Sequence, residues 1–170
     1  MPQVAAAGQG SIRDPRLKIG DAAPDFTCNT VDDQPLKLAD YKGKYVLLDF
    51  WATWCGPCVA ETPHLKSTFD AFGKDERFAM ISLSLDNTSE APKKFADDHG
   101  LAWTQGFLSR SSWQSSDSVA QKYGVLGIPS IFLIGPDGKV MASNLRGERI
   151  KTAVAAALDK SPATTATQKL

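Results

Sequence analysis

Blocks of apolar residues alternate with polar segments along the chain, and their lengths predict a series of short strands. Residues 45–52, YVLLDFWA, form a nearly continuous apolar run, which is typical of a strand buried on both faces. Residues 78–85, FAMISLSL, predict a second central strand. Shorter strands are predicted in residues 25–30 and 34–38, which flank the turn VDDQ, and in residues 103–108.

After the first central strand, the period of the pattern changes from that of a strand to that of a helix. Cys58, Thr62, Leu65, Phe69 and Phe72 recur at steps of four and three, which places them on one face of a helix. Further helices are predicted in residues 89–100, 118–124 and 149–158.

The last third of the chain predicts a hairpin followed by a helix. In residues 130–145 the turn PDGK joins the runs SIFLIG and VMASNL. Strands that alternate with helices before such a hairpin indicate an α/β sandwich with a mixed sheet. We expect one domain at residues 18–159, with a flexible leader at 1–17 and a disordered tail at 160–170, because both ends are rich in small and polar residues.

The composition of the 170 residues supports one domain and excludes some partners. Apolar residues make up 42%, enough for a sizeable core, and 19 basic residues balance 19 acidic ones. The chain therefore has no overall field to attract nucleic acid or an anionic membrane. No apolar run approaches the roughly 18 to 20 residues of a membrane span, and the start MPQVAAAGQGS lacks a signal-peptide pattern. A signal peptide that had been cleaved off would leave no trace in this sequence, so the sequence does not determine the compartment.

The chain has three cysteines, Cys28, Cys55 and Cys58, which are too few for a disulfide scaffold. Cys55 falls between the first central strand and the helix, where unpaired N–H groups and the helix dipole stabilise a thiolate. Pro57 falls in the first turn, where its missing N–H costs nothing. Cys58 lies on the stripe that faces the core. We therefore expect Cys55 to be exposed and activated and Cys58 to be shielded, as thiol–disulfide exchange requires.

Other uses of the cysteine pair are less favoured. A zinc site needs four ligands, and Cys28, His64 and His99 form no second close pair. Covalent haem needs a histidine directly after the second cysteine, where Val59 stands. A static disulfide across so short a loop would add little loop-closure entropy. Redox exchange is therefore the favoured use, and Cys28 is expected to be a small buried apolar side chain.

Two carboxylates lie close to the cysteines in the sequence. Asp49 interrupts the buried run, where an acid costs stability and has a raised pKa. It is either a proton acceptor for Cys58 or a residue at a strand edge that reaches water. Glu61 follows Cys58 by three residues and projects from nearly the same helical face. It is either part of the site or a solvated glutamate in the first turns.

Four segments carry a resemblance to a known family: APDF at 23–26, FWATWCGPC at 50–58, YGVLGIPSIFLI at 123–134 and GPDGKV at 135–140. In this order they resemble the thioredoxin superfamily, and more narrowly the TlpA/ResA-like thiol–disulfide oxidoreductases. The resemblance implies a thioredoxin-like three-layer α/β/α sandwich with a mixed central sheet and an N-terminal β-hairpin extension. It also implies an enzyme that uses its own redox-active disulfide, without a bound cofactor or metal.

The resemblance assigns roles to individual residues. It implies Cys55 as the attacking nucleophile and Cys58 as the resolving thiol. Asp49 falls at the thioredoxin position for a buried acid, and Glu61 falls where ResA-like proteins carry an active-site glutamate. By position, Ser82 stands where thioredoxin has a lysine partner for the buried acid, so this chain departs from the thioredoxin pattern there.

A proline far along the chain is expected to complete the site. Ile128-Pro129 matches the cis-proline turn opposite the cysteines, which would place the Ile128 backbone beside Cys55 to pair with a substrate strand. Trp51 and Trp54 flank the cysteines and are expected to pack around Cys55. The predicted substrate-binding residues are Trp54, Gly56, Pro57, Ile128 and Pro129.

The leading hypothesis is a disulfide oxidoreductase, and the Gly-Pro dipeptide between the cysteines resembles the reducing members of the superfamily. A thiol peroxidase of the peroxiredoxin group is one alternative, but Leu48 and Ala52 replace the proline and threonine of its pattern. A copper-delivery module is another, although its cysteine spacing differs by one residue.

The resemblance also suggests partners and a location. It suggests protein disulfides as substrates and a membrane reductase or a thioredoxin system as electron donor. It favours a monomer in the periplasm or another extracytoplasmic compartment, with the cytoplasm as the alternative.

Overall fold

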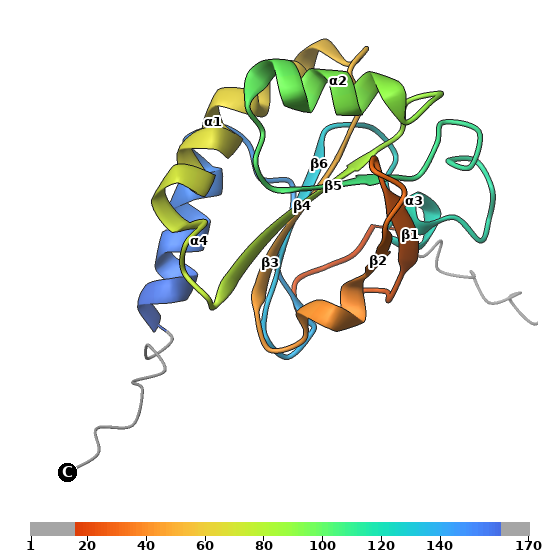
Figure 1. Ribbon diagram of the computed structural model, residues 1–170. Coiled ribbons are helices and arrows are strands. Elements are labelled where there is room, and N and C mark those ends of the chain that lie inside the picture. The colour runs from red at the N-terminus through yellow and green to blue at the C-terminus, as the bar shows by residue number, and fades with distance from the viewer. Residues whose placement is uncertain (1–15, 161–170) are drawn as a thin grey trace, which may run out of the picture.

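The computed structural model describes residues 16–160, which form a mixed sheet between two layers of other elements (Figure 1). The strands are β1 (Thr27–Thr30), β2 (Pro35–Lys37), β3 (Tyr45–Trp51), β4 (Phe78–Ser84), β5 (Thr104–Phe107), β6 (Ser130–Ile134) and β7 (Val140–Ala142). Their order in the sheet is β2-β1-β5-β4-β3-β6-β7. The central pairs β3–β4 and β4–β5 are parallel, and the remaining pairs are antiparallel. The mixed sheet and the N-terminal hairpin of β1 and β2 confirm the predicted fold class.

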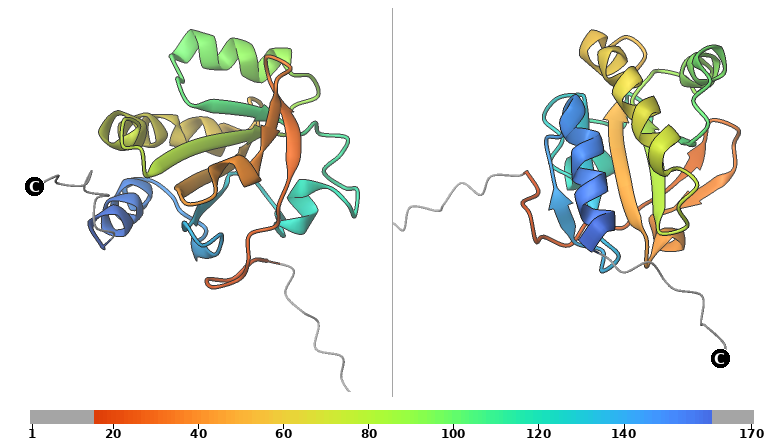
Figure 2. Two further views of the ribbon diagram at one scale, coloured as in Figure 1. Left: turned by 60° about the horizontal axis from the view of Figure 1, so that its bottom comes forward. Right: turned by 90° about the vertical axis from the view of Figure 1, so that its left-hand side faces the viewer.

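The helices cover the two faces of the sheet unequally. They are η1 (Leu38–Tyr41), α1 (Gly56–Phe72), α2 (Glu90–His99), α3 (Val119–Lys122) and α4 (Glu148–Lys160). One apolar core joins the sheet to α1, α2 and α4, and Figure 2 shows α1 and α4 side by side on that face. The core on the other face includes the short α3 and the hairpin. The predicted three-layer arrangement is therefore confirmed.

The side chains of β3 alternate between the two faces of the sheet, and this determines the layer against which each one packs. Successive side chains of a strand point to opposite faces. Leu48 and Phe50 lie in the core beside α3, and Leu47 lies in the core beneath α1. Asp49 is two residues from Leu47 and two from Trp51, so it points toward α1. The same helix presents its Cys58 stripe to the sheet.

The termini of the described part extend close to the predicted domain limits. Leu17 packs against the core beside α3, and α4 continues to Lys160. Most of the predicted leader and nearly all of the predicted tail lie outside the described residues. Within the described range, no helix has the length and apolar character needed to span a bilayer.

Candidate active site

The cysteine pair lies at the junction between the end of β3 and the start of α1, as the sequence predicts. Cys55 is the N-cap of α1, with extended backbone angles, and its Sγ accepts a hydrogen bond from the backbone N–H of Cys58 at 3.2 Å. Pro57 occupies the first turn. Cys55 and Cys58 form a disulfide, with their Cα atoms 5.2 Å apart. On reduction, the same N–H group and the positive end of the helix would stabilise a Cys55 thiolate.

The burial of the cysteines corrects one expectation. Cys55 was expected to be exposed, but it is only 6% exposed, and Cys58 is 3% exposed. The physical reason is packing, because both cysteines belong to a small apolar cluster with Trp51 and Ala52, and Ile128 packs against it. Neighbouring side chains therefore cover most of the Cys55 side chain.

The two tryptophans beside the cysteines behave differently, which corrects a second expectation. Trp51 is buried against the disulfide, as predicted. Trp54 is 48% exposed and does not belong to the cluster around Cys55. Its ring carries the guanidinium of Arg110, which lies 4.9 Å from the ring centroid. Trp54 faces solvent from the turn between β3 and α1.

The turn that precedes β6 lies next to the disulfide. The Ile128-Pro129 peptide bond is cis, as the resemblance implies. The carbonyl oxygen of Ile128 lies 3.6 Å from Cys55 Sγ. Arg146, which the sequence reasoning missed, donates a hydrogen bond to the carbonyl oxygen of Pro129. The turn is therefore held in place beside Cys55 Sγ.

A surface pocket of about 300 Å³ runs along this turn. Ile128, Pro129, Leu126 and Arg146 are among the residues that line it. The Leu126 side chain is exposed. Polar and apolar residues both line the pocket, among them Ser130, Asn144 and Phe132. Arg146 was not predicted, because it lies outside the recognised segments, and Leu126 was not singled out although it lies within YGVLGIPSIFLI.

Asp49 is buried in the middle of the sheet, so the alternative of a strand edge open to water is wrong. β3 is hydrogen-bonded on one side to β4 and on the other to β6. The hydroxyl of Ser82, its register partner on β4, donates a hydrogen bond to Asp49 Oδ2 at 3.2 Å. Within the described residues, Asp49 Oδ1 has no hydrogen-bond partner. Burial raises the pKa of Asp49 to about 7, although the Ser82 hydrogen bond and the charge of Arg146 oppose the rise.

A small cavity lies between Asp49 and Cys58. Its volume is about 10 Å³, close to the minimum that admits one water molecule. Asp49, Cys58 and Ser82 line it. Asp49 and Cys58 thus share one buried cavity.

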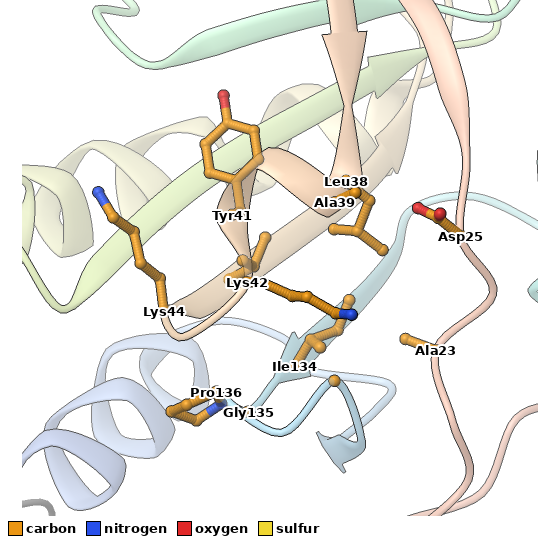
Figure 3. A pocket seen from close by; sticks show the side chains of 12 residues that line it. Ala23, Asp25, Leu38, Ala39, Tyr41, Lys42, Lys44, Ile134, Gly135 and Pro136 are labelled. Carbon is orange, nitrogen blue, oxygen red and sulfur yellow. The ribbon is translucent and has the colours of Figure 1, made fainter.

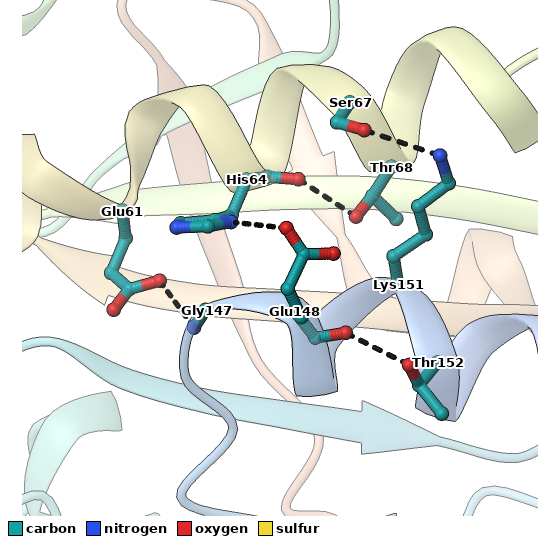
Figure 4. A network of polar contacts seen from close by, with 8 residues as sticks. All are labelled: Glu61, His64, Ser67, Thr68, Gly147, Glu148, Lys151 and Thr152. Atoms are coloured by element: carbon teal, nitrogen blue, oxygen red, sulfur yellow. Dashed lines mark hydrogen bonds and ion pairs between the residues drawn. The ribbon is translucent and has the colours of Figure 1, made fainter.

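Glu61 lies on α1, three residues after Cys58. Its Oε2 accepts a hydrogen bond from the backbone N–H of Gly147 at 2.8 Å, which ties α1 to the start of α4 (Figure 4). His64 and Glu148 face each other in the same seam at 3.6 Å. Glu61 is not among the residues that line the cavity at Cys58. Its negative charge nevertheless contributes to the raised pKa of Asp49.

A second buried acid, Asp86, was missed by the sequence reasoning. It follows the end of β4 and accepts hydrogen bonds from the backbone N–H of Thr53, from the Thr53 hydroxyl at 2.6 Å and from the Ser84 hydroxyl at 2.6 Å. Thr53 lies in the turn that carries Cys55. A signal that could have identified Asp86 is its charge directly after the apolar run of residues 78–85. Asp86 fixes the turn from the sheet.

Two other features lie apart from this site. The pocket of about 200 Å³ in Figure 3 lies at the opposite end of β3, where the Lys42 side chain extends across it. Cys28 lies on β1, partly buried against the core beside α3, and burial raises its pKa to about 11. A thiol with a raised pKa is a poor nucleophile at neutral pH.

A disulfide at a helix start, opposite a cis-proline turn on a mixed sheet, defines a thioredoxin-like thiol–disulfide oxidoreductase. The family model described as the AhpC/TSA family matches residues 19–143. ResA thiol–disulfide oxidoreductase from Bacillus thuringiensis subsp. konkukian is 32% identical over 139 residues, which cover 82% of this chain and 76% of that protein. The chain therefore belongs to the AhpC/TSA family and is a ResA-like thiol–disulfide oxidoreductase.

Solved structures give the same result. The thioredoxin domain of a thiol–disulfide oxidoreductase from Bacteroides vulgatus has a TM-score of 0.75 and 36% identity, covering 82% of this chain and 97% of that one. A thiol:disulfide interchange protein from a Bacteroides species has a TM-score of 0.75 and 34% identity, covering 86% and 93%. The recognised family, the fold and the enzyme class are thus confirmed. The roles of individual residues stay predictions.

Proposed function

We propose that the protein reduces disulfide bonds in other proteins, with Cys55 as nucleophile and Cys58 as resolving thiol. The observation that carries the proposal is the position of Cys55 Sγ, which lies at the start of α1 and 3.6 Å from the Ile128 carbonyl oxygen. A substrate strand that pairs with the turn at Ile128 and Pro129 would bring its own disulfide to this sulfur.

The reaction has two exchange steps. The Cys55 thiolate attacks one sulfur of the substrate disulfide, and the other substrate sulfur leaves as a thiolate that takes a proton from water. Cys58 then loses its proton to Asp49, and its thiolate attacks Cys55 Sγ. The bond between Cys55 and the substrate breaks, and the second substrate sulfur leaves as a thiolate. Two electrons have passed to the substrate, and the protein keeps the Cys55–Cys58 disulfide.

Asp49 is the proposed proton acceptor for Cys58, because the two share a buried cavity. A general base is most effective when its pKa lies near the working pH, and burial brings the pKa of Asp49 to about 7. Glu61 has the proposed role of holding the α1–α4 seam and modifying the charge around Asp49. Trp54, Gly56 and Pro57 form the proposed exposed rim against which the substrate docks.

The proposed partners follow from the resemblance. Protein disulfides in an extracytoplasmic compartment are the proposed substrates, and a membrane reductase or a thioredoxin system is the proposed electron donor. The proposed catalyst works as a monomer that needs no cofactor beyond its own cysteines.

The test is reduction of insulin disulfides by the chemically reduced protein. Cys55→Ser is expected to abolish the activity, while Cys28→Ser, the matched control, leaves it unchanged. Full activity of Cys55→Ser would overturn the proposal. Cys58→Ser is expected to accumulate mixed disulfides through Cys55, and partners trapped in this way from cell extract identify both substrate and compartment.

A further inference from the structure

Three buried side chains form a chain of hydrogen bonds beneath the disulfide. The indole N–H of Trp103 donates to Ser82 Oγ at 2.9 Å, and Ser82 Oγ donates to Asp49 Oδ2 at 3.2 Å. All three residues are buried, and they come from the segment before β5, from β4 and from β3. The Trp103 ring is held by Phe69 of α1, with the ring centroids 5.6 Å apart.

The direction of this chain is fixed by the chemistry of its members. An indole nitrogen is a donor only, so Trp103 cannot accept the hydroxyl proton of Ser82. A serine hydroxyl has a single hydrogen, and it is directed to Asp49 Oδ2 because its oxygen already accepts from Trp103. Hydrogen bonds in such a chain polarise one another, which strengthens the last donor. The chain therefore ends on one oxygen of the carboxylate.

The other oxygen of Asp49 is left for the active site. Among residues 16–160, Oδ1 has no hydrogen-bond partner, and Asp49 lines the same small cavity as Cys58. A buried carboxylate oxygen without a donor is the natural place for a proton. The two oxygens thus differ in function although they belong to one side chain.

We propose that Trp103 and Ser82 are positioning residues for the resolving step, because they occupy Asp49 Oδ2 and leave Oδ1 to take the proton of Cys58. This inference rests on the proposed role of Asp49. The Cys58 S–H bond breaks, the proton moves to Oδ1, and the electron pair on sulfur forms the bond to Cys55 Sγ. The pair from the broken bond between Cys55 and the substrate leaves with the substrate sulfur.

The hydrogen bonds from Trp103 to Ser82 and from Ser82 to Asp49 also affect the pH range in which Asp49 can accept a proton. Burial raises the pKa of Asp49, and the Ser82 hydrogen bond lowers it because that bond favours the charged form. Among the charged groups, Arg146 lowers this pKa and Glu61 raises it. Cys58 faces Asp49 from α1, while β6 pairs Ile131 with it. Without these two hydrogen bonds, Asp49 would be ionised in a smaller fraction of the molecules at neutral pH.

Stopped-flow kinetics with 5,5′-dithiobis(2-nitrobenzoate) separates the two exchange steps. Reduced protein releases one coloured thiolate when Cys55 attacks the reagent and a second when Cys58 resolves the mixed disulfide. Ser82→Ala is expected to move the pH midpoint of the second phase upward by about one unit, because a hydrogen bond to a carboxylate has about that effect on its pKa. Trp103→Phe is expected to cause a smaller upward shift. The first phase should keep its wild-type pH profile in both variants.

Matched variants separate positioning from packing. Phe69→Leu removes the ring that packs on Trp103 but no polar atom, so its midpoint should equal that of the wild type. Ser82→Thr retains the hydroxyl and should restore most of the wild-type midpoint. In an Asp49→Asn background, Ser82→Ala should cause no further shift. Carbon-13 NMR titration of the Asp49 carboxyl in the oxidised protein measures the same shift without any turnover.

Each outcome decides between the proposals. An unchanged second phase in Asp49→Asn overturns the role of Asp49 itself. A slowed second phase in Asp49→Asn, with wild-type midpoints in Ser82→Ala and Trp103→Phe, overturns the donor chain but not Asp49. Equal shifts in Trp103→Phe and Phe69→Leu assign the effect to packing and also overturn the donor chain.

Discussion

Two buried aspartates flank the redox-active disulfide, and the structure treats them in opposite ways. Asp86, on the side of the turn, accepts three hydrogen-bond donors from Thr53 and Ser84. Asp49, beneath the disulfide, accepts one from Ser82 and has an oxygen without a partner among residues 16–160. Both side chains are almost fully buried. Burial therefore does not distinguish them, whereas the number of donors does.

The difference shows how one small site separates support from chemistry. A carboxylate with many donors holds its surroundings in place. A carboxylate with few donors and a dry environment exchanges its proton near neutral pH, as the raised pKa of Asp49 indicates. Asp86 fixes the turn that carries Cys55. Asp49, beside Cys58, has one carboxylate oxygen without a hydrogen-bond partner in residues 16–160.

The largest expected effect at a fixed pH is a loss of stability when Asp86 is removed. Asp86→Ala leaves the donors of Thr53 and Ser84 unpaired, so we expect the free energy of unfolding to fall by about 3 kcal/mol. Urea denaturation measures this change. Asp86→Asn retains one acceptor oxygen and should lose less. An equal loss in Asp49→Asn would contradict the distinction between the two acids.

The next effect concerns the pH dependence of stability. The folded protein holds the Asp49 proton more tightly than the unfolded chain, because burial raises its pKa from 3.8 to about 7. The stability that this proton contributes is present at low pH and is lost as the pH rises through about 7. Asp49→Asn should therefore remove a decline of a few kcal/mol from the stability–pH curve. Urea midpoints across this range measure it, and parallel curves would refute the raised pKa.

A smaller loss of stability is expected when one of the hydrogen-bond donors to Asp86 is removed. Thr53→Val removes one hydroxyl donor while the backbone N–H of Thr53 keeps its bond, so the loss should be about 1 kcal/mol. The pH midpoint of the resolving phase should not change, because Thr53 does not line the cavity at Cys58. A shifted midpoint would show that the two acids act as one network.

The smallest effect is a shift in the opposite direction from that of Ser82→Ala. Glu61→Gln removes a negative charge that raises the pKa of Asp49. The midpoint of the resolving phase should therefore fall by about 0.3 units, since charges separated by several ångströms interact weakly through protein and water. The glutamine carbonyl can still accept from the N–H of Gly147. An upward shift would assign to Glu61 a direct role in proton transfer.

The order of strands and helices, the place of the cysteines and the cis turn at Pro129 were all predicted from the sequence. The elements follow from local rules, because the period of apolar residues and the chemistry of turns act over a few positions. The start of α1 at Cys55 and the apolar run of β3 are properties of neighbouring residues. The cis turn came from the resemblance of YGVLGIPSIFLI to a known family.

The burial of Cys55, the exposure of Trp54 and the partners of the two acids were decided by tertiary structure alone. Ser82 lies 33 residues from Asp49 and Trp103 lies 21 from Ser82, so their contact depends on strand register and on the packing of α1. Thr53 and Asp86 also meet only when β3 and β4 pair. A local pattern places each polar group on a face of the sheet, but the partners of that group are fixed only when distant elements pack together.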